Sequence, residues 1–252
     1  MTTTMHLTAW ACLCGPVLGM MASTALAGEP ATPAPTANRP VRVACVGDSL
    51  TSGFQMAKPE QDAYPAQLGR LLGTNWEVRA FAVPGRTALR KADLALWKEK
   101  VFADAQAWQP DAVVLCLGSN DSWPAIWQKL GGEFAGDLRA MVDLFAKLPS
   151  HPRIWLCVPP PFFIEHGEVQ QRIMTQEINP AVRAVAKESG CAVIDWYAAL
   201  AGHPELFMAD KVHPLPGAAA VMAKAAADSL GQPAERRAGS QTSPNSAEKA
   251  HD

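Results

Sequence analysis

The chain has 252 residues, a formal net charge of −2 and 48% hydrophobic residues. This length fits one domain of roughly 100–200 residues with additional segments, and the composition is that of a protein with a real hydrophobic core. A net charge this close to zero gives no reason to expect a nucleic acid or an acidic membrane surface as a partner.

The first 27 residues have the pattern of a secretory signal peptide. Residues 1–27 contain no Asp, Glu, Lys or Arg, and an apolar run from Leu7 to Met21 is followed by Ala25-Leu26-Ala27. Such a run before an A-x-A sequence is typical of a cleaved signal, and it is shorter than the roughly 20 apolar residues of a membrane anchor, the alternative interpretation. We expect a secreted or periplasmic protein with no stable membrane insertion after cleavage.

Composition divides the rest of the chain into three parts. Residues 28–40 are rich in Pro, Ala and Thr and predict a flexible linker. Residues 232–252 are polar without apolar periodicity and predict a disordered tail. The folded domain is therefore expected at 41–231.

Apolar runs alternate with helix-like segments through this domain. The expected strands are 41–46, 76–82, 112–117, 153–158 and 191–195. The expected helices are 62–72, 98–108, 133–148, 169–189 and 216–230, with a kink or a break at Pro180. Most strands are continuous apolar runs, as in sheets covered on both faces. The alternation predicts a three-layer α/β domain with a five-stranded parallel sheet.

Four cysteines follow the signal-like segment, each in or beside an expected strand. They have no C-x-x-C spacing, so no zinc site is predicted, and they fit the role of small buried hydrophobes. Export would still permit oxidation, so the sequence leaves their pairing open. These residues are Cys45, Cys116, Cys157 and Cys191.

Polar residues follow the expected strands at the edge where parallel sheets form their sites. Ser49 lies in Gly47-Asp48-Ser49-Leu50 after the first strand, and Asp210 precedes His213 by three residues before the last helix. A serine hydroxyl becomes a nucleophile when a base takes its proton and an acid orients that base. We expect Ser49, His213 and Asp210 in these roles.

Acyl transfer also needs donors for the oxyanion. Gly85 follows the second strand, and its backbone N–H can approach a substrate closely because glycine has no side chain. The Asn120 side chain and the Ser49 N–H are the other expected donors. Asp48 and Asp121 are expected to brace loops through backbone N–H groups.

Several residues compete for these roles. Ser49 could instead cap a helix, and Asp195 is a rival acid that we interpret as structural. His151, His166 and His203 have no acid three residues before them, whereas His213 has both this acid and a proline after it.

In these motifs the chain resembles the SGNH subgroup of GDSL-type hydrolases. The four marker residues match as Ser49, Gly85, Asn120 and His213, in the order of that family, with Asp210 as the acid. The resemblance covers 41–230 and implies a flavodoxin-like fold and ester hydrolysis without a metal or another cofactor.

Finer similarity points to carbohydrate O-acetylesterases of the sialate and xylan type. It is carried by 83–87, 118–123, 156–161 and 204–207, with Pro84 where Ser is expected in that branch. The resemblance implies removal of acetyl groups from a glycan or a small ester. The expected substrate contacts are Arg86, Trp123, Trp127, Phe162 and its neighbour Phe163.

Two other functions stay open. The same machinery with a longer acyl pocket would make a lipolytic esterase, a lysophospholipase or a thioesterase. The same fold could also belong to a binding protein without catalysis. The dinucleotide motif G-x-G-x-x-G, the P-loop and the α/β-hydrolase motif G-x-S-x-G are all missing from the sequence. The sequence does not predict the oligomeric state.

Overall fold

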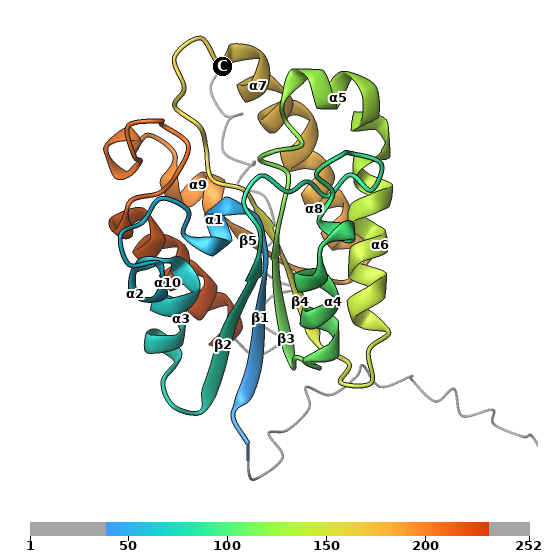
Figure 1. The fold of residues 1–252 in the computed structure, drawn as a ribbon, viewed down its shortest axis with the longest axis vertical. Helices are drawn as coiled ribbons and strands as arrows, with labels where there is room; N and C mark the ends of the chain where they lie inside the picture. Colours follow the sequence, from blue (N-terminus) through green and yellow to red (C-terminus); the bar gives the residue numbers. More distant parts are fainter. Residues whose placement is uncertain (1–38, 232–252) are drawn as a thin grey trace, which may run out of the picture. The chain divides into compact units, whose positions relative to one another are not determined.

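The computed structural model describes residues 39–231. The signal peptide, most of the linker and the tail expected from the sequence lie outside these residues. Within the described part, a five-stranded parallel sheet has the strand order β2-β1-β3-β4-β5 (Figure 1). This is the flavodoxin-like order, and it confirms the predicted fold.

The strands agree with the sequence prediction to within one residue. Each inner strand is an apolar run because helices cover both of its faces. The outer strand β2 has two exposed residues, Arg79 and Ala80. The strands are β1 (Val41–Gly47), β2 (Trp76–Ala82), β3 (Ala112–Cys116), β4 (Arg153–Val158) and β5 (Ala192–Asp195).

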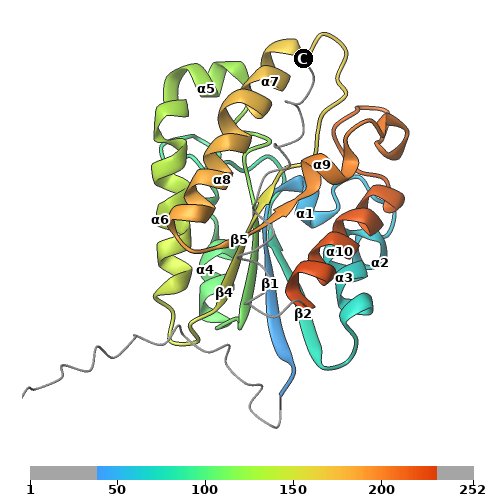
Figure 2. The same ribbon diagram turned by 180° about the vertical axis from the view of Figure 1, so that it is seen from behind.

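Helices cover the two faces of the sheet and surround its carboxyl edge. Those on one face are α3 (Tyr64–Leu72) and α10 (Pro216–Gly231), and those on the other are α4 (Lys100–Ala107), α6 (Phe134–Ala146) and α8 (Asn179–Glu188) (Figures 1 and 2). The shorter helices are α1 (Ser49–Ser52), α2 (Pro59–Asp62), α5 (Pro124–Leu130), α7 (Glu168–Ile173) and α9 (Trp196–Leu200).

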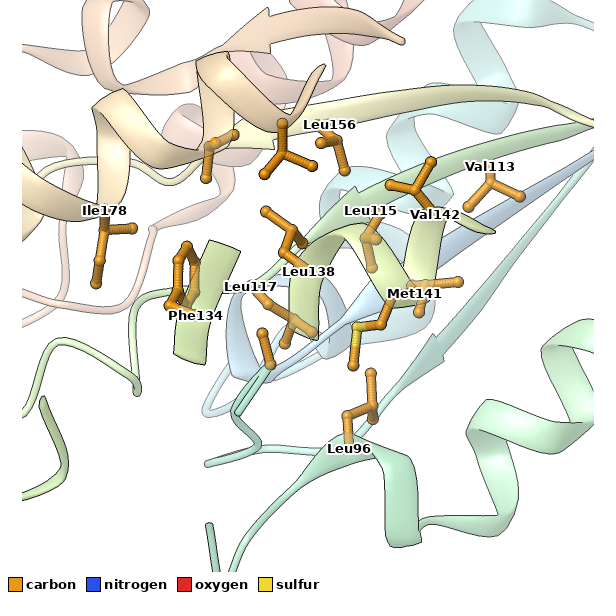
Figure 3. Packing of buried hydrophobic residues seen from close by; sticks show 14 of the residues in the cluster. Leu96, Val113, Leu115, Leu117, Phe134, Leu138, Met141, Val142, Leu156 and Ile178 are labelled. Carbon is orange, nitrogen blue, oxygen red and sulfur yellow. The ribbon is translucent and has the colours of Figure 1, made fainter. Parts of the chain in front are cut away.

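Two hydrophobic clusters lie on opposite faces of the sheet. Figure 3 shows part of the first, in which Phe134, Leu138 and Met141 of α6 pack against Leu115 of β3 and Leu156 of β4. The second joins β1, β3 and β4 to α3 and α10. Three of the four cysteines are buried in it, as expected of small hydrophobes, and all four, whose pairing the sequence left open, are free.

The expected irregularity at Pro180 takes the form of a π-helical segment. Met174–Ile178 is π-helical and joins α7 to α8, with Pro180 in the first turn of α8. Proline has no N–H for a bond to the preceding turn, and a wider turn before it accommodates this loss without a break.

Candidate active site

Four loops meet at the carboxyl edge of the sheet. β1 and β3 are neighbours, and Gly47 at the end of β1 pairs with Cys116 at the end of β3. The segments after these strands therefore begin side by side. This pairing brings Asp48 within hydrogen-bond distance of Asn120 although the two residues are 72 positions apart.

The serine motif forms a tight strand-to-helix turn. Ser49 is the first residue of α1, 7% of it is exposed, and Asp48 caps the helix by accepting a hydrogen bond from Leu50 N–H at 3.0 Å. A Cβ at Gly47 would lie 2.3 Å from Thr51 Oγ1 and 2.6 Å from the Cys116 carbonyl oxygen. Only glycine fits there, which explains the first residue of the motif.

Asp48 has a second partner in the next loop. Its Oδ2 accepts a hydrogen bond from Asn120 Nδ2 at 3.0 Å. Asp48 is completely buried, and this burial raises the pKa of its carboxyl group to about 7 although Leu50 N–H and the Asn120 amide favour the charged form. The carboxyl group therefore links the turn that carries Ser49 to Asn120, as a brace rather than as a surface charge.

Asn120 uses its amide nitrogen twice. Besides Asp48, Asn120 Nδ2 donates to the Arg86 carbonyl oxygen at 3.0 Å. An amide nitrogen has two hydrogens, so both have acceptors within the chain before any substrate is bound. Asn120 can donate to an oxyanion only by exchanging or sharing one of these bonds.

Gly85 differs from Asn120 in this respect. Its φ of +78° lies in the left-handed region, and no heavy atom would lie within 4 Å of an added Cβ. Glycine is favoured here by backbone conformation rather than by crowding. Within residues 39–231, the Gly85 N–H has no hydrogen-bond acceptor.

Asp121 braces the loop that carries Gly85. Its two carboxyl oxygens accept hydrogen bonds from Ala88 N–H at 3.2 Å and Leu89 N–H at 3.0 Å. Burial raises the pKa of Asp121 to about 7 against the effect of these donors. The expected bracing role of both aspartates is confirmed.

His213 and Asp210 form a hydrogen-bonded pair. Asp210 Oδ2 lies 2.7 Å from His213 Nδ1, while Oδ1 accepts from the backbone N–H groups of His213 and Val212, each at 3.0 Å. Partial burial alone would raise the pKa of Asp210, but the three hydrogen bonds outweigh it and lower the pKa. Asp210 therefore presents a carboxylate to the ring, and the other nitrogen, Nε2, is left to accept a proton.

The loop around this pair is held by its own backbone. Met208 N–H donates to the His213 carbonyl oxygen at 2.8 Å, and Phe163 N–H donates to the Lys211 carbonyl oxygen at 2.9 Å. The second bond ties the His213 loop to the segment that follows β4. These two hydrogen bonds hold the backbone of the loop that carries His213.

The rival residues have other partners. Asp195 caps α9 by accepting from Ala198 N–H and also pairs with Arg183. His203 pairs with Glu205. Of the two candidate acids, Asp210 is the one that contacts the His213 ring, so Asp195 has the structural role that the sequence suggested.

The five expected substrate contacts differ in their surroundings. Arg86 Nε donates to Glu99 Oε1 at 2.6 Å, so its charge already has a partner. Trp127 Nε1 donates to Glu177 and its ring packs against Phe134. Of the five expected contacts, Trp123 alone is largely exposed, at 50%. The carbohydrate-contact role of these residues stays a prediction.

Phe162 and Phe163 are packed rather than open. Phe162 is 7% exposed and lines a cavity of about 150 Å³ together with Ile164, Glu168 and Gln170. The Phe163 ring packs edge-on against Phe207, with ring centroids 5.1 Å apart. Phe162 therefore forms part of the cavity wall, and Phe163 is packed against another aromatic ring.

Phe54 was missed by the sequence analysis. It follows α1, its N–H donates to the Ser49 carbonyl oxygen at 3.1 Å, and its ring centroid lies 5.1 Å from that of His213. A single aromatic residue after a short helix carries no periodic signal, so the sequence could not have identified it.

Comparisons with known proteins identify the family of the chain. The family model of the GDSL-like Lipase/Acylhydrolase family matches residues 45–220. An acetylxylan esterase from Xylanibacter ruminicola is 36% identical over 191 residues, which are 69% of this chain and 40% of that protein. The chain therefore corresponds to well under half of that relative's length.

Solved structures share the fold. A carbohydrate acetylesterase from Sinorhizobium meliloti is 17% identical with a TM-score of 0.62, covering 75% of this chain and 98% of its own. A variant of an acetyl-xylooligosaccharide esterase from Geobacillus is 24% identical with a TM-score of 0.60, covering 77% of this chain and 96% of its own. The chain belongs to the GDSL-like lipase/acylhydrolase family.

Proposed function

We propose that this protein removes acetyl groups from carbohydrate through a covalent acetyl-enzyme on Ser49. The observation that carries the mechanism is the Asp210–His213 pair, because its 2.7 Å hydrogen bond leaves Nε2 as the proton acceptor. The acetylated-sugar substrate is supported by the acetylxylan esterase relative, which is 36% identical.

In the first step, Ser49 Oγ attacks the acetyl carbonyl carbon while His213 Nε2 takes the hydroxyl proton. The Gly85 N–H and the Ser49 N–H donate to the oxyanion, joined by Asn120 when it releases the Arg86 carbonyl oxygen. The tetrahedral intermediate collapses, and the imidazolium protonates the departing sugar oxygen. Water then repeats the sequence on the acetyl-enzyme and releases acetate.

Asp48 and Asp121 support these steps without touching the reacting atoms. Asp48 orients the Asn120 amide, and Asp121 holds the backbone that follows Gly85. Preorganised donors of this kind are each worth about 3–4 kcal/mol in related chemistry. The residues that carry them must be held in place before the substrate arrives.

Export is part of the proposal. Residues 1–27 have the pattern of a signal peptide, and an enzyme acting on plant or microbial glycans would meet its substrate outside the cytoplasm. No helix in the described part of the chain is long and apolar enough to span a membrane. Detection of a mature form that begins near Gly28 would test the export step.

A substrate panel tests the chemistry. Acetylated xylo-oligosaccharides and a series of esters from acetate to octanoate should be hydrolysed with a steep preference for acetate. A clear preference for octanoate would refute the sugar-acetyl assignment in favour of a lipolytic esterase or a thioesterase. A fluorophosphonate probe should label Ser49, and absence of labelling would indicate a binding protein.

A further inference from the structure

We propose that Phe54 is the platform on which the sugar ring of the departing alcohol stacks, an inference that rests on the proposed function. Among the large apolar side chains of the described residues, Phe54 combines exposure with contact to the base: 42% of it is exposed, and its ring centroid lies 5.1 Å from that of His213 at an interplanar angle of 56°.

The reaction itself dictates where the departing alcohol lies. His213 must return its proton to the alcohol oxygen, so this oxygen must come within about 3 Å of the imidazole nitrogen. The first sugar ring is bonded directly to that oxygen. A side chain whose ring touches the imidazole and is open to solvent therefore lies beside the place of this sugar.

Phe54 lies in a turn whose backbone conformation is constrained. Gly53 before it has φ +72°, and Gln55 after it has φ +65°. A left-handed conformation is unfavourable for a residue such as Gln and persists where the surroundings enforce it, often at functional sites. A Cβ on Gly53 would lie 2.6 Å from Ala63 Cβ, so the turn is packed tightly against its neighbour on the inner side.

An exposed aromatic ring in this position suits a pyranose. The C–H groups on one face of a sugar ring are apolar, and burying them against an aromatic face is favourable, whereas the hydroxyl groups at the rim keep their water. The same ring adds little for a small alcohol such as ethanol. Phe54 should therefore select for the alcohol and not for the acyl group.

The test compares two acetate esters that form the same acetyl-enzyme. For Phe54→Ala, kcat/KM should fall about tenfold with acetylated xylobiose and less than threefold with ethyl acetate. Phe54→Tyr, which keeps the ring, should restore the wild-type ratio. Active-site titration with a fluorophosphonate corrects every rate for misfolded enzyme.

Two further variants control for exposure alone. Leu71→Ala removes an apolar side chain that is 57% exposed on α3 and should leave both rates unchanged. Trp123→Ala removes the other largely exposed aromatic side chain near the strand ends. If Trp123→Ala loses the sugar selectivity and Phe54→Ala keeps it, the assignment to Phe54 is wrong.

The remaining outcomes separate this inference from the proposed function. An equal loss on both esters in Phe54→Ala would show that the ring acts only by positioning His213, which overturns the platform. Unchanged selectivity in Phe54→Ala would overturn it as well. If wild-type enzyme hydrolyses ethyl acetate but not acetylated xylobiose, the carbohydrate substrate itself is refuted, and the platform with it.

Discussion

Replacing Asp210 with Asn isolates the role of its carboxylate toward His213. Oδ1 accepts the two backbone N–H groups and Oδ2 faces the ring nitrogen. An Asn side chain can keep its oxygen on the backbone and place its NH₂ group against His213 Nδ1. That donor forces the ring proton onto Nε2, so the ring can no longer accept the proton of Ser49.

The expected effect is large on catalysis and small on folding. Loss of the correct tautomer in such a triad lowers kcat by about 10⁴-fold. The Asp210 side chain is 33% exposed, so water can partly replace it, and we expect a loss nearer 10³-fold, or about 4 kcal/mol of transition-state stabilisation. The backbone hydrogen bonds survive, so the melting temperature should change little.

The assay is steady-state hydrolysis of an activated acetate ester, with thermal unfolding measured in parallel. Asp195→Asn is the matched control, because Asp195 caps α9 and pairs with Arg183 instead; it should retain activity. If Asp210→Asn keeps more than about a tenth of the wild-type kcat, the orienting role of Asp210 is wrong.

The proposed catalytic residues Ser49 and His213, the buried Asp121 and Gly47 give three further predictions. Ser49→Ala and His213→Ala should each lower kcat by orders of magnitude, and the double variant should be little worse than either, because such groups act as a unit; near wild-type turnover in His213→Ala would refute its role. Burial raises the pKa of Asp121 in the folded protein to about 7, whereas the unfolded chain has the ordinary value of 3.8. Between these two pH values the folded state binds more protons than the unfolded state. The free energy of unfolding of the protein therefore falls as the pH rises from about 4 to 7. In urea unfolding at pH 5 and pH 8, the free energy of unfolding of Asp121→Asn should therefore change less between the two pH values than that of the wild type. An equal change in both proteins would contradict the raised pKa of Asp121. Gly47→Ala should destabilise the fold by about 1–3 kcal/mol, because the new Cβ meets Thr51 Oγ1 at 2.3 Å and the Cys116 carbonyl oxygen at 2.6 Å. Adding Thr51→Ala should recover only part of this loss, and full recovery would show that the carbonyl contact is harmless.

Much of the fold was predictable because its signals are local. Continuous apolar runs identify strands buried on both faces, so all five strands were predicted to within one residue. The apolar residues of α6 recur at helical spacing, and the buried side of the helix consists of them. Short helices such as α1 and α9 were missed, because four or five residues are too few to show a period.

The motif positions and the Asp210–His213 pair were also predictable, but the other contacts of these residues were not. The strand-end rule singled out Ser49, Asn120 and His213 without any knowledge of distances. The partners of the residues around the site depend on loop conformation. Arg86 pairs with Glu99, and Asn120 donates both of its amide hydrogens to acceptors within the chain. Such contacts join residues far apart in the sequence, where no spacing rule applies.

The sequence by itself determined the strands and the order of the motifs, because these depend on neighbours along the chain. Only the tertiary structure decided which residues meet. The placement of β1 beside β3 brings Asp48 to Asn120 across 72 positions. A left-handed turn between α1 and α2 carries Phe54, and its ring meets that of His213 from the far end of the chain, where no local pattern could indicate the contact.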